Sequence, residues 1–261
     1  MKFSANLGFL WAELPLPRAI FAAQDAGFDA VECHWPYDTP ASEVNDALKA
    51  CGFTMLGLNT LRGNPGENGL AALPGREKQA RIYIDKAIAY AQETGTLNVH
   101  VMAGISHGAR ARETFIANLT YASDQALAHG ITILIEPLNN YDAPGYFLTS
   151  CDQAVSIMEE VARPNLKLMF DCYHVQLMEG DLCHRLQTLK PHIGHIQFAS
   201  VPDRGPPDWG EIDYSFLFSR ISELGYDLIL GAEYKPSGPT ENSLDWMKTL
   251  CQLENSDNVL R

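Results

Sequence analysis

The chain has 261 residues, of which 32 are acidic and 19 basic, so its formal net charge is -13 at neutral pH. This charge disfavours nucleic-acid binding, which depends on neutralising phosphates with lysine and arginine. No apolar run reaches the roughly 18 residues that a membrane-spanning helix needs, and the N-terminus has no leader-like pattern. We therefore expect a cytoplasmic protein that acts on a small-molecule substrate, without nucleic-acid or membrane partners; a homo-oligomer is left open.

Hydrophobic residues make up 46% of the chain and charged residues 20%, which is enough for a sizeable core. The six cysteines are scattered, and no pair has the spacing of a zinc cluster or suggests a disulfide framework. We expect free thiols in a reducing compartment. The cysteines are Cys33, Cys51, Cys151, Cys172, Cys183 and Cys251.

Eight apolar segments with strand character alternate with helical segments. The strand candidates are Lys2–Leu7, Phe28–Glu32, Thr54–Asn59, Leu97–Met102, Ile131–Glu136, Leu166–Phe170, Ile193–Phe198 and Leu228–Glu233. Gly52, Gly95 and Gly130 follow helical segments, where glycine commonly forms the C-cap. The alternation predicts a parallel sheet, and eight units favour an α/β fold with a single (β/α)8 TIM barrel domain over residues 1–261. No G-x-G-x-x-G follows the first strand, which removes the main support for a dinucleotide-binding fold.

The segments between the strands carry helical signals. Residues 11–26 have a mostly small apolar face, and residues 80–91 and 115–127 carry apolar stripes at helical spacing. Ser150, with Gln153 three residues later, resembles a capping box at the start of another helix. The connection 60–76 is longer than a plain loop, and we predict a lid over the barrel mouth there.

Polar side chains end the last four predicted strands. These residues are Glu136, Asp171, Gln197 and Glu233. Because the chemistry of a barrel lies at the carboxyl ends of its strands, the four are expected to face a common point. An all-oxygen set suits Mg2+ or Mn2+, whereas a zinc site would include histidine or cysteine. Any one of them, Asp171 for example, could instead cap a helix, but four caps together explain the pattern less well because isolated buried carboxylates are unfavourable.

This arrangement permits proton transfer beside a carbonyl group. A divalent ion can stabilise the charge that develops when a carbon-bound proton is removed next to a carbonyl. Glu136 and Glu233, on opposed flanks, would remove and return that proton. The sequence shows no rich histidine set for a multinuclear hydrolase.

Several segments resemble the hydroxypyruvate isomerase family, which includes the 2-oxo-tetronate isomerases and lies within the xylose isomerase-like TIM barrel superfamily. The matching segments are Leu134–Asn139, Phe170–Gln176, Gly194–Gln197, Gly210–Tyr214 and Glu233–Pro236. The resemblance spans residues 2 to about 248 and includes Asn59 and the predicted lid. It implies an aldose-ketose type isomerase that interconverts hydroxypyruvate and tartronate semialdehyde, or 2-oxo-tetronate and 3-oxo-tetronate. Some motifs of the chain are more similar to the 2-oxo-tetronate isomerases, and others are more similar to the hydroxypyruvate isomerases.

The resemblance implies metal ligands at Glu136, Asp171, Gln197 and Glu233, and proton-transferring acids at Glu136 and Glu233. It also places His174 and Arg204 against substrate oxygens.

Four further residues are expected to bind substrate: Lys235, Glu32, Asn59 and His100. Three of them have a simpler alternative, since His100 could be a core histidine, Lys235 could pair with a loop acid, and Glu32 could hold a loop. His195 could face the site or be buried away from it. The remaining histidines are expected in loops or at the surface: His34, His107, His129, His184 and His192.

Two other functions remain open on the sequence. A ketose 3-epimerase acting on a small sugar would use the same two glutamates on opposite faces of its substrate. A non-catalytic barrel that binds a metal and a sugar acid would need the ligands but not the proton transfer. A superfamily endonuclease is disfavoured by the acidic charge.

Overall fold

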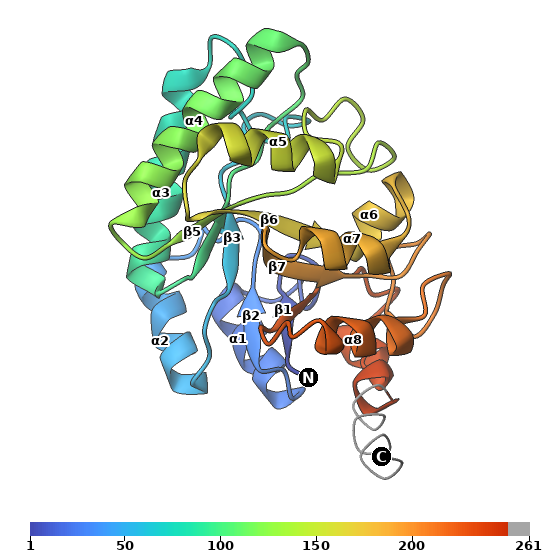
Figure 1. Ribbon diagram of the computed structural model, residues 1–261. Helices are drawn as coiled ribbons and strands as arrows, with labels where there is room; N and C mark the ends of the chain where they lie inside the picture. Colours follow the sequence, from blue (N-terminus) through green and yellow to red (C-terminus); the bar gives the residue numbers. More distant parts are fainter. Residues whose placement is uncertain (250–261) are drawn as a thin grey trace.

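The computed structural model describes residues 1–249, in which eight parallel strands form one sheet that curls into a barrel (Figure 1). The strands are β1 (Phe3–Asn6), β2 (Ala30–Glu32), β3 (Gly57–Asn59), β4 (Asn98–His100), β5 (Thr132–Ile135), β6 (Leu166–Asp171), β7 (Ile193–Phe198) and β8 (Leu230–Ala232). Their order in the sheet is β2-β1-β8-β7-β6-β5-β4-β3. A bridge between Val31 and Met55 joins β2 to the segment before β3, and the amide of Leu56 donates to the carbonyl of Val31 at 2.7 Å. The predicted single-domain (β/α)8 barrel is confirmed.

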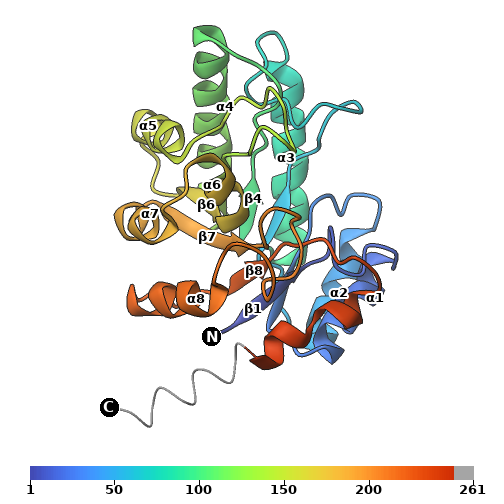
Figure 2. The same ribbon diagram turned by 90° about the vertical axis from the view of Figure 1, so that its right-hand side faces the viewer.

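Helices surround the barrel and connect successive strands. They are α1 (Leu16–Asp25), α2 (Ala41–Cys51), α3 (Glu77–Thr94), α4 (Ala109–Leu127), α5 (Cys151–Val161), α6 (Cys172–Met178), α7 (Leu182–Leu189) and α8 (Tyr214–Glu223), with a short 3-10 helix at Thr240–Ser243. Figure 2 shows α5, α7 and α8 along one side of the barrel and α1 and α2 on the other. The strands therefore have helices on one face and the barrel interior on the other.

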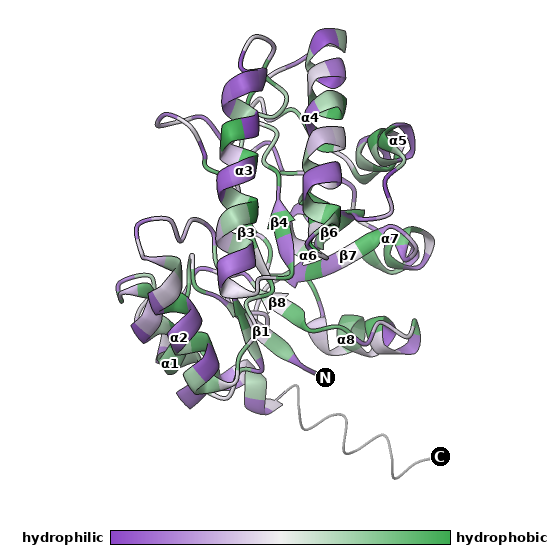
Figure 3. Cartoon of the chain, turned by 90° about the vertical axis from the view of Figure 1, so that its left-hand side faces the viewer, coloured by the Kyte–Doolittle hydropathy of each residue, from purple (hydrophilic) through white to green (hydrophobic). Residues whose placement is uncertain are grey.

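This enclosure explains the apolar strand sequences. Val99, Ile133 and Phe198 are fully buried, as expected of parallel strands that are covered on both faces. The helices carry hydrophobic and hydrophilic residues along their length (Figure 3). In α4, Phe115 and Leu119 are among the buried residues, and their four-residue spacing places them on the same helix face.

The helix expected at residues 11–26 begins later than predicted. Residues 11–14 form turns, and α1 starts at Leu16 after Pro15, with a proline in its first turn. Trp11 has a φ of 49° and is almost fully buried, and its Nε1 donates to Glu241 at 2.7 Å. Trp11 thus belongs to the core packing before the helix, and the apolar spacing alone could not locate the helix start.

The structure agrees better with the predicted caps of three other helices. Gly52 and Gly95 are left-handed C-caps with φ of 67° and 69°, as predicted. The hydroxyl of Ser150 accepts from the amide of Gln153 at 3.1 Å and so caps α5. The side chain of Gln153 reaches back to the amide of Thr149 at 3.0 Å, one residue earlier than a capping box requires.

The cysteines and the helix lengths bear on two further expectations. Five described cysteines are free thiols, as predicted: Cys33, Cys51, Cys151, Cys172 and Cys183. Cys251 lies outside the described residues. Within residues 1–249, no helix has both the length and the apolar character needed to cross a membrane.

The long connection 60–76 is partly held against the end of β4. Leu70, Ala71 and Ala72 are buried, and the amide of Ala72 donates to the carbonyl of Ala103 at 2.7 Å. Gly69 pairs with Ala103 in an antiparallel bridge. This anchored part leaves the preceding residues to approach the barrel mouth, and a closing motion of the segment stays a prediction.

We expect Gly69→Ala to destabilise the protein more than Gly66→Ala. Both glycines have positive φ, 100° and 88°, so both substitutions strain the backbone. Only at Gly69 would the new Cβ lie 2.2 Å from a backbone oxygen, that of Met102, whereas nothing lies within 4 Å at Gly66. Urea unfolding should show an additional loss of about 1–3 kcal/mol for Gly69→Ala. Equal losses would contradict the anchoring.

Candidate active site

A cavity of about 350 Å³ opens at the carboxyl ends of the strands. Seven of the ten residues expected in the site line it: Asn59, His100, Glu136, His174, Arg204, Glu233 and Lys235. They come from segments that follow or end several different strands, as a barrel site requires. A larger cavity of about 800 Å³ includes Asn139 and Tyr141 in its lining but none of the expected carboxylates. The smaller cavity is therefore the candidate active site.

The other three expected residues lie deeper. Asp171, Gln197 and Glu32 are 1%, 2% and 3% exposed, and they are not among the residues that line the cavity. Asp171 lies opposite Gln197 in the register of β6 and β7. The structure therefore brings the expected metal ligands to one end of the barrel but places the Gln197 amide against Glu32, from which it is 3.0 Å.

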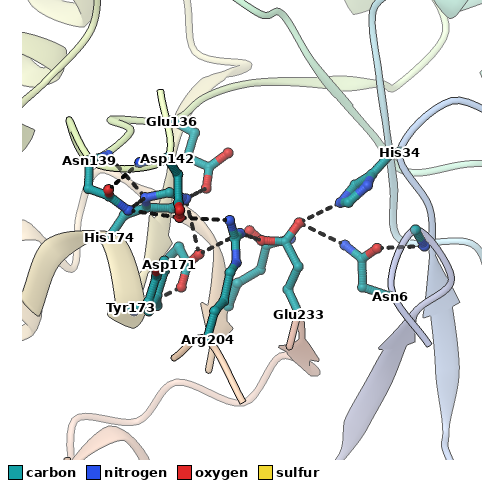
Figure 4. A network of polar contacts seen from close by, with 12 residues as sticks. Asn6, His34, Glu136, Asn139, Asp142, Asp171, Tyr173, His174, Arg204 and Glu233 are labelled. Carbon is teal, nitrogen blue, oxygen red and sulfur yellow. Dashed lines mark hydrogen bonds and ion pairs between the residues drawn. The ribbon is translucent and has the colours of Figure 1, made fainter. Parts of the chain in front are cut away.

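Glu233, which follows β8, lies between two groups of polar residues (Figure 4). One carboxylate oxygen accepts from the amide of Asn6 at 3.0 Å and lies 2.8 Å from Nε2 of His34. The other oxygen pairs with the guanidinium of Arg204, which also lies 3.4 Å from Asp171. Arg204 thus supplies positive charge to two buried acids.

Arg204 is held in place from several sides. Its guanidinium carbon lies 4.9 Å from the ring centre of Tyr173 and 5.0 Å from that of Phe9. Its backbone φ of 54° is uncommon for a residue other than glycine, and such conformations cluster at functional sites. The aromatic rings and the paired acids together fix a cation at the centre of the site.

Glu136, Asp171 and His174 form a second group. Nε2 of His174 lies 3.7 Å from a carboxylate oxygen of each acid, and one ligand atom from each of the three residues lies within 4.8 Å of the others. Asp171 uses its other oxygen to accept from the amide of Tyr173 at 2.9 Å and so caps α6. The capping role and a role in the site are therefore compatible, because each uses a different oxygen.

The hydrogen bonds of His174 decide which ring nitrogen can act. The backbone amide of Asn139 donates to Nδ1 of His174 at 3.0 Å. Nδ1 is therefore an acceptor, and in the neutral ring the proton is on Nε2. Burial lowers the pKa of His174 to about 3, and Arg204 acts in the same direction, so the ring is neutral near pH 7. His174 presents a donor towards the acids and is better suited to a substrate oxygen than to a metal ion.

The oxygen atoms of the site fit a hard divalent ion. One oxygen of Glu136 and the amide oxygen of Gln197 are buried and make no hydrogen bond within the described residues. An unpaired buried oxygen is unfavourable unless something binds it. Together with Asp171 and Glu233 these atoms provide the all-oxygen ligands that Mg2+ and Mn2+ prefer. The expected ligand residues therefore fit such an ion, with His174 as a neighbour.

The two glutamates differ in their electrostatic surroundings. Burial raises the pKa of Glu136 well above its ordinary value, and the charge of Glu233 raises it further. Burial acts in the same direction on Glu233, but Arg204 and His34 outweigh it, so the pKa of Glu233 is lowered. Glu136 therefore holds a proton under conditions in which Glu233 is ionised.

His100 and Asn59 form a pair on one side of the cavity. Nδ1 of His100 lies 3.3 Å from the amide oxygen of Asn59 and 3.7 Å from Glu136. Burial lowers the pKa of His100 to about 4, and its Nε2 is buried without a hydrogen-bond partner in residues 1–249. His100 is thus a buried histidine whose Nε2 is available to bind a ligand in the cavity.

His34 was expected in a loop or at the surface and it lies in the loop after β2, but its position in the cavity was not predicted. His34 lines the cavity, and its side chain is 12% exposed and contacts Glu233. It follows the end of β2 by two residues, and this closeness to the barrel mouth is the signal that could have found it. The other histidines assigned to loops or the surface are exposed or half-buried: His107, His129, His184 and His192.

Comparisons with known proteins identify the family of this chain. Residues 20–250 match the family of xylose isomerase-like TIM barrels. The chain belongs to this family.

Among its relatives, the 2-oxo-tetronate isomerase of Cupriavidus necator is 44% identical over 253 residues, covering 95% of this chain and 97% of that protein. The hydroxypyruvate isomerase of Escherichia coli is 36% identical, covering 95% and 98%. The resemblance to hydroxypyruvate isomerases is thus confirmed, and with it the prediction that this xylose isomerase-like barrel is an isomerase.

Solved structures agree on the fold of this xylose isomerase-like barrel. A Brucella melitensis protein described as a family 2 AP endonuclease is 40% identical, with a TM-score of 0.92, and the match covers 95% of this chain and 98% of that one. An L-ribulose 3-epimerase has a TM-score of 0.82 at 16% identity, covering 100% and 99%. At that identity the epimerase shows the shared fold alone.

We expect the metal-free protein to lose stability as the pH rises from about 6.5 to 8, because below about 6.5 the lowered pKa values of His100 and His174 act in the opposite direction. Burial raises the pKa of Asp171 to about 8, an effect that Arg204 reduces and Glu233 reinforces. A group whose pKa is higher in the folded than in the unfolded state binds more protons when folded, so its contribution is lost as the pH rises through the folded pKa. Each such proton changes the free energy of unfolding by about 1.4 kcal/mol per pH unit.

Asp171→Asn should flatten this pH dependence, because asparagine can still cap α6 but does not titrate. Denaturant unfolding with a chelator present, measured at several pH values for both proteins, tests the expectation. Identical slopes would show that Asp171 is not the titrating group.

Proposed function

We propose that this protein is a divalent-metal-dependent isomerase that moves a carbonyl group within a short hydroxy-oxo acid. The observation that carries the proposal is the position of Glu136 and Glu233, two buried glutamates that face one cavity from the ends of β5 and β8, the first with a raised and the second with a lowered pKa. General acid–base catalysis needs such a pair, one group free to accept a proton and the other able to give one.

In the proposed reaction, Glu233 removes the proton from the hydroxyl-bearing carbon. Glu136 returns a proton to the neighbouring carbon that carried the carbonyl, and the hydroxyl proton passes to the former carbonyl oxygen. Exchange with solvent then removes the proton gained by Glu233 and restores the one lost by Glu136. One carbon is oxidised and its neighbour is reduced, so substrate and product have the same composition. The donor Nε2 of His174 lies 3.7 Å from both Glu136 and Asp171, where it can hydrogen-bond a substrate oxygen.

An ion such as Mg2+ or Mn2+, held by Glu136, Asp171, Gln197 and Glu233, would stabilise negative charge on the substrate oxygens. Asp171 and Gln197 contribute oxygens without moving protons. Arg204 keeps Glu233 ionised and orients its carboxylate, which prepares this residue as the base.

The cations at the cavity rim favour an acidic substrate over a neutral ketose. Lys235 lines the cavity and its ammonium lies 5.5 Å from the ring centre of Phe9, without an ion pair to any residue in the described range. Arg62 also lines the cavity, stacks on Trp35 at 4.6 Å and donates to Asn68, again without an ion pair in that range. A substrate carboxylate would meet these charges, whereas an uncharged sugar would leave them unused.

The relatives agree with this substrate class. Proteins 36% and 44% identical to this chain are named for hydroxypyruvate and 2-oxo-tetronate, both short oxo acids. NMR of the products formed from each compound, with Mg2+ or Mn2+ present, tests the proposal directly. Formation of tartronate semialdehyde or of 3-oxo-tetronate supports it, and a product epimerised at one carbon with its carbonyl unmoved would support the epimerase instead.

We expect Glu136→Gln and Glu233→Gln each to lower kcat by about 10²- to 10⁴-fold, because each removes a proton-transferring group. Glu13→Gln, which changes an exposed acid, should leave the rate unchanged. Deuterium uptake from solvent should fall with the rate in both site variants. Full turnover by either variant would contradict the two-glutamate mechanism.

We expect Lys235→Met to raise KM for hydroxypyruvate about tenfold while kcat stays within about threefold, because a charge-assisted contact to the carboxylate is worth roughly 1.5 kcal/mol. Lys235→Arg should preserve most of the affinity. The effect should weaken at high salt, since Lys235 is exposed. An unchanged KM in Lys235→Met would remove Lys235 from the substrate contacts.

A further inference from the structure

A buried polar cluster lies among β1, β2 and β7, next to the active site. One oxygen of Glu32 lies 3.0 Å from the side-chain nitrogen of Gln197 and 3.1 Å from Nε2 of His195. The other oxygen accepts from the hydroxyl of Ser4 at 3.2 Å. All four residues are at most 4% exposed, and none lines the active-site cavity. Glu32 therefore contacts protein groups in the interior.

The carboxylate of Glu32 fixes the orientation of the Gln197 amide. An ionised carboxylate only accepts hydrogen bonds, so the nitrogen of Gln197 must face it. The amide oxygen of Gln197 is then turned away, and it is buried without a hydrogen-bond partner in the part of the chain that the structure describes. An unconstrained amide could rotate and exchange the two atoms.

The strand register places Gln197 beside the acids of the site. Gln197 lies opposite Asp171 on β6 and opposite Gly231 on β8, two residues before Glu233. Residues opposite each other on neighbouring strands share a face of the sheet. The amide of Gln197 is thus flanked by Asp171 and by the strand that leads to Glu233.

Gly231 leaves the space that this cluster occupies. A Cβ at this position would lie 2.1 Å from a carboxylate oxygen of Glu32, 2.9 Å from Cγ of Gln197 and 2.9 Å from Nε2 of His195. Gly231 is not among the glycines with positive φ, so its backbone conformation does not explain the glycine. The absence of a side chain on β8 allows Glu32 to reach β7.

We propose that Glu32 is a positioning residue, which turns the oxygen of Gln197 towards the metal-binding acids, and this role rests on the proposed function. The arrangement explains how a glutamine can serve reliably as an oxygen ligand in a buried site. Groups that orient metal ligands typically change metal affinity by about 10- to 100-fold when they are replaced.

The test measures Mn2+ binding to the substrate-free protein by electron paramagnetic resonance, with thermal unfolding in parallel. Glu32→Gln should weaken Mn2+ binding at least tenfold, because an amide at position 32 no longer selects one orientation of the Gln197 amide. Gly231→Ala keeps every polar group but displaces Glu32, and it should weaken binding in the same direction. Glu13→Gln serves as the matched control and should bind like the wild type.

The reciprocal double variant Glu32→Gln/Gln197→Glu separates positioning from general stability. The nitrogen at position 32 would then donate to the new carboxylate at position 197, whose second oxygen takes the place of the amide oxygen. Mn2+ affinity should return to within about threefold of the wild type, whereas Gln197→Glu alone places two carboxylates together and should bind poorly. This comparison holds even if Glu32→Gln alone fails to fold.

The outcomes distinguish the two proposals. If the wild-type protein does not bind Mn2+, the proposed function fails and the role of Glu32 fails with it. If the wild type binds and Glu32→Gln binds equally well, or the double variant does not improve on Gln197→Glu, the positioning role alone is wrong.

Discussion

Buried negative charge is the constraint on which the active site depends. Glu136, Asp171 and Glu233 are each at most 5% exposed and share one end of the barrel. Removing several carboxylates from water costs several kcal/mol for each ion unless they are paired or neutralised. The fold meets this cost with one guanidinium, that of Arg204, and by raising the pKa of two of the acids. The same charge distribution makes the site favourable for a further cation.

The position of Arg204 turns this constraint into an asymmetry between the glutamates. Arg204 pairs with Glu233 and Asp171, and it also lies 3.5 Å from Asp142. Glu136 has weaker compensation, with neutral His174 and His100 at 3.7 Å. A single cation, placed off-centre among the acids, therefore separates their protonation states. In the proposed mechanism, an acid and a base arise from two chemically identical side chains because their surroundings differ.

Much of this could be predicted from the sequence, because strand ends and apolar runs are local signals. The run before Glu136 and the repeated pattern before Glu233 locate both residues at the barrel mouth without any knowledge of packing. The start of α1 could not be located in the same way, since Trp11 is apolar but packs before the helix with a positive φ. The role of His34 in the cavity was not predicted, because His34 lies two residues beyond the strand end at Glu32, in a loop. The contact of Glu32 with Gln197 joins residues 165 positions apart, and no local pattern specifies it.

His174 and Gln197 acquire different roles because a hydrogen bond from a neighbouring residue fixes the orientation of each side chain. The amide of Asn139 binds Nδ1 of His174 and leaves a donor at Nε2, whereas Glu32 binds the nitrogen of Gln197 and leaves an acceptor at the oxygen. The donor suits a substrate oxygen, and the acceptor suits a cation. His174 lies near enough to Glu136 and Asp171 to complete a metal-binding triad by distance alone. The direction of its proton argues against that role and would leave the proposed metal ion to oxygen atoms, so in this proposal the chemistry of the site follows from how the side chains are oriented as much as from which residues are present.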